Sequence, residues 1–381
     1  MRLNRKQWNQ GDLNRNPFVM QRTHTTHRVL IDAPVARLFE RACLAGQPGW
    51  LPVGSARLSY SDSGKDEKNA LWSESETGPA LFRKPALRTF WTTTLLDPER
   101  HRYQAVLSNP ELAMGTLDVE MEEQDDGTVV RFDLSYTVLS EAGSALFDEE
   151  IGGRLDRLLE GFGHTLTSSL TAELAPPVTV GSHQAQRRGV QHEMTISGDI
   201  DECFALACPV AELLCIDDWQ FDLIYSKSGR NETGCIFLEP GTGLSIVRSP
   251  GANTYWYTTR FDTEQHRFEA IWLTRDLTIA RWELNMTDLG GGQTRVHWSL
   301  IYTGLGRDGS RIIGESGFDE RMKRVLSFLA TSLKHYVETG SIYRLSSQRK
   351  VQIAASLIGA ALGRHFRGQR TSDGSASQLP R

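Results

Sequence analysis

The pattern of apolar and polar positions changes its period several times along the second half of the chain. Residues 192–197 alternate as a short strand does, and Asp199 followed three positions later by Glu202 is typical of a helix N-terminus. Six runs rich in aromatic and β-branched residues come next, with turn residues between them. These runs cover residues 220–225, 234–238, 254–262, 267–273, 278–286 and 294–303. Apolar residues spaced by three or four from Phe318 to Tyr336 then predict a long amphipathic helix.

The first half of the chain repeats this pattern. Residues 24–174 align with residues 190–340 at an offset of 165, and the offset becomes 166 after one extra residue in a glycine turn at 290–292. Trp91 matches Trp256, for example, and Tyr60 matches Tyr225. A slip confined to a turn indicates a duplicated fold, because an insertion inside a strand would turn its core side chains outward.

We therefore expect two tandem domains of one architecture. The first domain spans residues 24–174 and the second spans residues 190–340, with a linker at 175–189 between them. An N-terminal extension at 1–23 precedes them, and a basic helical tail with a disordered end follows at 341–381. The element order predicts an α+β class in which a curved antiparallel sheet wraps a long C-terminal helix. Such a helix alone does not fill the sheet's inner face, so we expect a cavity between them.

Composition and charge narrow the class of function. The chain has 381 residues, 39 % of them hydrophobic and 23 % charged, which is ordinary for two globular domains. The net charge is −5, although the tail itself carries seven Lys or Arg against a single Asp. The acidic body does not suit binding to nucleic acid, which needs a basic face.

Several other kinds of site are not indicated. Five cysteines without C-x-x-C spacing, and no apolar leader or membrane-spanning run, suggest a cytoplasmic protein with reduced thiols. We find no metal-ligand spacing and no phosphate-binding glycine motif, so neither a metal nor a cofactor is expected.

Three segments of the second domain resemble a known superfamily. They are a Tyr-Ser-x-Ser-Gly-x-x-Glu-x-Gly hairpin from Tyr225 to Gly234, a Trp-x-x-Thr-x-x-Asp strand from Trp256, and a Thr-Arg-Val strand that ends in Tyr302-Thr303. Together with the element order, they are similar to the START-like superfamily, also called SRPBCC or helix-grip. The resemblance covers both domains, although Asn69 stands where the second domain has Gly234. It implies a helix-grip fold and functions like those of polyketide cyclases or pathogenesis-related ligand carriers.

The candidate binding residues come from strand alternation, which assigns aromatic side chains to the inner face of the second sheet. These residues are Tyr225, Trp272, Trp282, Trp298 and Tyr302. The three tryptophans align with Leu107, Leu117 and Phe132, so the second domain presents more planar surface, which either binds a planar ligand or fills the core. We find no titratable group that points into the cavity in both domains, and the catalytic residues therefore stay unknown.

The leading hypothesis is that the second domain binds a small hydrophobic molecule, either aromatic or lipid-like. An enzyme of the polyketide cyclase or aromatase type is the alternative, because some cyclases that resemble this chain carry two such domains. A second alternative is a ligand-responsive adaptor that acts through its tail. Residues 341–367 combine an apolar middle with basic ends, which suits a peripheral membrane or a protein partner.

Overall fold

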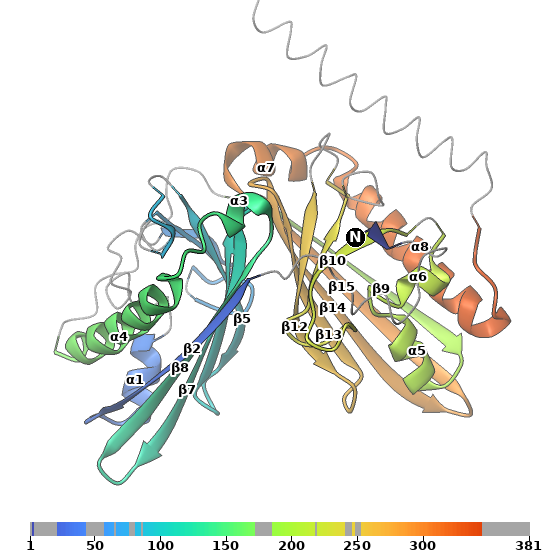
Figure 1. Cartoon of the computed structure of the whole chain (residues 1–381). Coiled ribbons are helices and arrows are strands. Elements are labelled where there is room, and N and C mark those ends of the chain that lie inside the picture. The colour runs from blue at the N-terminus through green and yellow to red at the C-terminus, as the bar shows by residue number, and fades with distance from the viewer. Residues whose placement is uncertain are drawn as a thin grey trace, which may run out of the picture.

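Two antiparallel sheets dominate the computed structural model (Figure 1). The structure describes residues 2–3, 21–42, 57–64, 66–75, 81–84, 87–171, 185–217, 219–240, 246–247 and 253–344. The expected linker up to residue 184, most of the N-terminal extension and the tail from residue 345 lie outside these ranges.

The first domain is a seven-stranded sheet with the order β2-β8-β7-β6-β5-β4-β3. Its strands are β2 (Arg22–Ile31), β3 (Arg57–Tyr60), β4 (Leu71–Glu74), β5 (Thr89–Asp97), β6 (Arg102–Asn109), β7 (Ala113–Gln124) and β8 (Gly127–Val138). Its helices are α1 (Val35–Ala42), the short α3 (Glu141–Ser144) and the long α4 (Ile151–Ser169). The chain meanders through neighbouring strands from β3 to β8, and the first strand β2 closes the far edge by pairing with β8.

The second domain repeats this order and adds one strand at its edge, giving β1-β10-β11-β12-β13-β14-β15-β9. Its strands are β9 (Arg187–Ser197), β10 (Phe221–Tyr225), β11 (Ile236–Glu239), β12 (Thr254–Asp262), β13 (Arg267–Thr274), β14 (Thr278–Gly290) and β15 (Gln293–Gly304), with β1 (Arg2–Leu3) paired to β10. Its helices are α5 (Ile200–Leu206), α6 (Glu212–Cys215), α7 (Gly306–Ile313) and α8 (Phe318–Thr339). Helix α5 begins as expected, because the Asp199 carboxylate accepts hydrogen bonds from the backbone N–H groups of Asp201 and Glu202.

Each long helix packs on the inner face of its own sheet. Helix α8 buries Met322, Leu326 and Leu333 against the second sheet, and α4 buries Leu155 and Phe162 against the first. This arrangement confirms the predicted α+β class and the tandem pair of helix-grip domains. The short helices α3 and α7, which precede α4 and α8, were not predicted.

The outer faces of the two sheets pack against each other. In Figure 1 the sheets lie side by side in the centre, with α4 on one flank and α8 on the opposite flank. A buried apolar cluster joins the outer faces, and it includes Val106 and Met114 of the first domain and Tyr255, Ile271 and Leu273 of the second. Most strands at the centre of the molecule are therefore buried on both faces.

Two equivalent arginines extend this contact at its ends. Arg22 of β2 lies over the Tyr225 ring of the second domain, at 4.4 Å from its centroid, and donates a hydrogen bond to the Gly234 carbonyl at 3.2 Å. Arg187, its counterpart in the repeat, lies over the Tyr60 ring of the first domain at 3.7 Å. The duplicated chain thus makes a reciprocal contact, in which each domain holds the first hairpin of the other.

Candidate functional site

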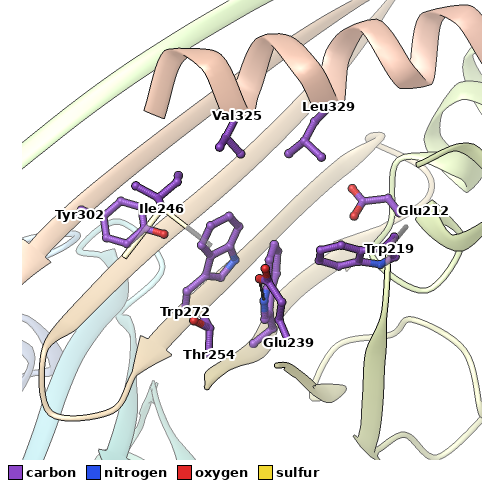
Figure 2. Close-up of a pocket in the computed structure, with 10 residues that line it drawn as sticks. Glu212, Trp219, Glu239, Ile246, Thr254, Trp272, Tyr302, Val325 and Leu329 are labelled. Atoms are coloured by element: carbon purple, nitrogen blue, oxygen red, sulfur yellow. Dashed lines mark hydrogen bonds between the residues drawn. The ribbon is translucent and has the colours of Figure 1, made fainter. Parts of the chain in front are cut away.

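A narrow cavity lies between the second sheet and helix α8 (Figure 2). It is lined by Glu212, Trp219, Glu239, Ile246, Thr254, Trp256, Trp272, Tyr302, Val325 and Leu329. Its volume of about 20 Å³ is enough for a single water molecule. The cavity therefore stands where it was expected, but the structure shows a much smaller space than a bound organic molecule needs.

Indole rings occupy most of the remaining interior. Trp256 and Trp272 face each other across β12 and β13 as a directly opposed pair, and their ring centroids lie 3.7 Å apart. Trp282 of β14 stacks on Trp272 from the other side at 5.1 Å. This cross-strand stack fills much of the space between sheet and helix, and in Figure 2 the indole of Trp272 points towards the side of α8 that carries Val325 and Leu329.

The polar end of the cavity holds a buried carboxyl that the residue pattern had not revealed. Glu239, at the end of β11, is 4 % exposed, and its Oε2 accepts a hydrogen bond from the indole Nε1 of Trp256 at 3.3 Å. Among the described residues, neither its other oxygen, Oε1, nor the indole N–H of Trp272 has a hydrogen-bond partner. A buried polar atom without a partner costs about 1–3 kcal/mol, so this cavity is poised to receive a hydrogen-bonding group.

A second carboxyl, Glu212 of α6, lies at the same end of the cavity (Figure 2). Burial raises the pKa of Glu239, and burial together with the neighbouring negative charge of Glu239 raises the pKa of Glu212. Two buried carboxyls with raised pKa values hold protons near neutral pH, so the pair can both donate and accept a hydrogen bond or a proton.

The recurrence of this carboxyl corrects the sequence analysis, which found no titratable group that points inward in both domains. Glu74 of β4 is the counterpart of Glu239, and it accepts a hydrogen bond from Trp91 Nε1 at 3.3 Å, as Glu239 does from Trp256. The signal was present, because Glu239 is two residues after the inward-facing Phe237 and so shares its face.

The five predicted binding residues have different positions. Trp272 and Tyr302 line the cavity, and Trp282 contacts it through the stack. Burial raises the pKa of Tyr302 well above its ordinary value, so its hydroxyl stays protonated. Trp298 is buried in the same core, but its ring packs beside His192 at 5.9 Å and is not part of the cavity lining.

Tyr225 was assigned to the wrong face. The register of β10 against β11 shifts between Leu223 and Tyr225, because Ile224 is an extra residue there. Such a bulge turns the following side chains to the opposite face. Tyr225 therefore packs on the outer cluster under the guanidinium of Arg22 and does not contribute to the cavity.

Other kinds of site receive no support from the described ranges. These residues contain no group of three or more His, Cys, Asp or Glu side chains placed to hold a metal ion. Among the same residues, no helix combines the length and the apolar character needed to cross a bilayer.

Comparison with known proteins gives structural likenesses only. No protein-family model matches the chain, and no curated protein matches it. The di-domain ARO/CYC BexL is 16 % identical with a TM-score of 0.30, over 83 % of this chain and 99 % of that one. The di-domain ARO/CYC StfQ from the steffimycin biosynthetic pathway is 13 % identical with a TM-score of 0.32, over 82 % of this chain and 98 % of that one.

A single-domain match is norcoclaurine synthase from Thalictrum flavum, crystallised with dopamine and hydroxybenzaldehyde. It is 13 % identical with a TM-score of 0.30, over 41 % of this chain and 90 % of that one. TM-scores near 0.3 are too low to carry an argument about function. The tandem arrangement of two sheets, each with its long helix, therefore rests on this chain's own strand order and packing.

Proposed function

We propose that the second domain binds a small, largely apolar molecule, aromatic or lipid-like, through one polar group. The observation that carries this proposal is a pair of buried atoms in one apolar cavity, Oε1 of Glu239 and Nε1 of Trp272, which find no hydrogen-bond partner within the described part of the chain. A hydroxyl or carbonyl group on the ligand accepts from the indole, and a hydroxyl also donates to the carboxyl, which removes both desolvation penalties at once.

Binding of such a molecule requires the cavity to open. The wall opposite the indoles is made of aliphatic side chains, Ile246 from one loop and Val325 and Leu329 from α8. A ligand that displaces them gains about 25 cal/mol for each Å² of apolar surface removed from water. The stacked indoles provide the planar surface against which an aromatic ligand packs.

Calorimetric titration with 2-naphthol and naphthalene tests this proposal, because the two probes differ by one hydroxyl. We expect the full-length protein to bind 2-naphthol at least about tenfold more tightly than naphthalene, which is 1.4 kcal/mol for one hydrogen-bonded group. Glu239→Leu should reduce that preference, and Val325→Trp should abolish binding of both probes by filling the cavity. Leu158→Trp on α4 of the first domain is the matched control and should leave the titration unchanged. Equal affinity for both probes in the native protein would contradict the proposal.

Acid–base catalysis is a second candidate function, and the carboxyl pair favours it. Burial brings the pKa values of both carboxyls towards neutrality, and the charge of Glu239 raises that of Glu212 further, into the range where a general acid or base is most efficient. This agrees with the cyclase or aromatase alternative, in which the cavity would open to fold a reactive chain and lend it a proton donor or acceptor. Turnover of such a chain should then be lost in Glu212→Gln and Glu239→Gln, while 2-naphthol still binds.

The cellular setting and the role of the tail stay proposals as well. The four described cysteines are buried, and buried thiols are typical of proteins in a reducing compartment, so we keep a cytoplasmic location as a proposal. The tail beyond residue 344 lies outside the described residues, so the adaptor hypothesis rests on its sequence. Deletion of residues 345–381 should change membrane or protein partners if that hypothesis holds, and should leave 2-naphthol binding intact.

A further inference from the structure

The two sheets enclose a buried ionic network where they meet. Arg281 of β14 is 3 % exposed and pairs with both Glu269 and Glu283 of the second domain. Its guanidinium also donates to the Thr94 carbonyl of the first domain at 3.2 Å. Lys68 reaches across from the first domain and places its Nζ 2.8 Å from Glu283. Arg267 pairs with Glu269 as well, at 2.7 Å, so three cations and two carboxylates meet at this place between the sheets.

The internal repeat creates an equivalent place on the other side of the contact, and there Arg281 and Lys68 have no basic counterparts. Threonine replaces both of them, with Thr116 at the position that matches Arg281 and Thr233 at the position that matches Lys68. A cavity of about 200 Å³ occupies this place. It is lined by Arg22, His24, Gln104, Thr116, Asp118, Asp133, Ser135, Thr233, Gly234, Tyr257 and Thr259.

One of the two carboxylates has an acidic counterpart in this cavity, whereas only Arg267 of the three cations has a basic one, Arg102. Asp118 is the counterpart of Glu283, and its Oδ1 accepts a hydrogen bond from the Gln104 amide at 2.8 Å. Burial raises the pKa of Asp118, and neither that bond nor the charge of Arg102 offsets the shift. In the ionic network around Arg281, burial also raises the pKa of Glu283. There the charges of Arg281 and Lys68 outweigh burial and lower this pKa to about 2.

The other charged groups of the cavity have partners within the protein. Asp133 pairs with Arg131 at 2.7 Å and accepts a hydrogen bond from Thr26. Arg22 is held by the Gly234 carbonyl and by the Tyr225 ring. The side chain of His24 is 59 % exposed and lies near Asp133. Asp118 is therefore the carboxyl that a cation entering the cavity would meet.

We propose that this interdomain cavity binds a small organic cation with N–H donors, a guanidinium or a primary ammonium, which pairs with Asp118. The ligand stands where the Arg281 and Lys68 head groups stand on the other side of the contact. The hydroxyls of Thr116 and Thr259 and the Gln104 carbonyl oxygen supply acceptors for its remaining N–H groups. Because the lining comes from both domains, the bound cation also strengthens the contact between them.

Agmatine is the probe of choice, because it carries a guanidinium at one end and a primary ammonium at the other. We expect calorimetry at low salt to show millimolar binding of agmatine to the full-length protein, and little or no binding of tetramethylammonium, which has the charge without the donors. Asp118→Asn should weaken agmatine binding at least about tenfold. Asp125→Asn removes the same charge from an exposed turn, and it should leave binding unchanged.

A tethered cation provides the second arm of the test. Thr233→Lys restores the lysine that the first domain has at position 68, at an exposed position where a longer side chain fits. The ammonium group of the introduced lysine should occupy the site beside Asp118 and so abolish agmatine binding. The same ion pair should raise the thermal unfolding midpoint. The proposal is overturned if the native protein does not bind agmatine, if tetramethylammonium binds equally well, or if Asp118→Asn and Thr233→Lys bind agmatine as the native protein does.

Discussion

The indole Nε1 of Trp256 donates a hydrogen bond to Oε2 of Glu239 at 3.3 Å inside the second domain. Trp91 and Glu74 make the same bond at the same distance in the first domain. The duplication has therefore kept a buried carboxyl and its indole partner in both interiors. A second carboxyl distinguishes the second domain, because the repeat places Gln47 opposite Glu212. The indole N–H of Trp272 is a further difference, because Leu107 matches it in the first domain, and we therefore propose the binding function for the second domain.

The stability of the protein should fall as the pH rises through neutrality because of this carboxyl pair. Burial raises the pKa of Glu239 to about 7 in the folded state, so its contribution to stability is fully present below about pH 4.5 and is lost as the pH rises through 7. Each unit of pKa difference corresponds to about 1.4 kcal/mol. The glutamine in Glu239→Gln stays neutral at every pH. Between pH 5 and pH 8 the free energy of unfolding of this variant should therefore fall by roughly 3 kcal/mol less than that of the native protein.

Urea titrations at several pH values measure this difference. Glu264→Gln, in an exposed turn, is the control and should follow the native pH dependence. Identical pH profiles for Glu239→Gln and the native protein would show that Glu239 is ionised at neutral pH, contrary to its burial.

Loss of the buried arginine between the sheets should destabilise the fold strongly. Arg281→Met removes the buried positive charge that pairs with Glu269 and Glu283, and loss of one partner of a buried ion pair typically costs about 3–5 kcal/mol. We expect about 3 kcal/mol, because Arg267 and Lys68 still pair with these carboxylates. Replacing the pair together, as Arg281→Met with Glu269→Met, should recover most of this loss. Chemical denaturation followed by fluorescence measures both values, and a cost below about 1 kcal/mol for the single variant would contradict the role of the network.

Arg187 should contribute to the contact between the domains far more than its neighbour does. It stacks on Tyr60, pairs with Asn69 and Thr303, and has a side chain that is 10 % exposed, so Arg187→Met should cost about 2 kcal/mol through lost charge-assisted hydrogen bonds. The adjacent Arg188 is 48 % exposed and 3.9 Å from its carboxylate partner. Arg188→Met should therefore cost less than about 0.5 kcal/mol, and equal losses for both variants in thermal denaturation would refute the assignment.

Much of the fold could be predicted because it depends on local patterns. The predicted strand at 254–262 coincides with β12. The apolar spacing that predicted the closing helix, from Phe318 to Tyr336, lies within α8. The contact between the sheets also left a signal that we did not use. Tyr255 and Tyr257 alternate with Trp256 in β12, so this strand is apolar on both faces, as strands buried on both sides are.

The parts that could not be predicted depend on contacts between distant residues. The bulge that turns Tyr225 outward depends on its pairing with Ile236 of the next strand. Helix α7 contains Gly309, where a Cβ atom would lie 1.7 Å from the Leu277 carbonyl oxygen, and this close approach is invisible in a local pattern. The size of the cavity is set by the direct opposition of Trp256 and Trp272, which depends on strand register.

The most direct measurement is the indole N–H resonance of Trp272 during a titration with 2-naphthol. The protein has nine tryptophans, and Trp272→Phe assigns this resonance in a spectrum of ¹⁵N-labelled indoles. Our account predicts that Trp272 gains a hydrogen-bond acceptor and shifts downfield, that Trp256 shifts through Glu239, and that Trp91 of the first domain does not move. A Trp272 resonance unchanged at saturation with 2-naphthol would contradict the proposed binding site.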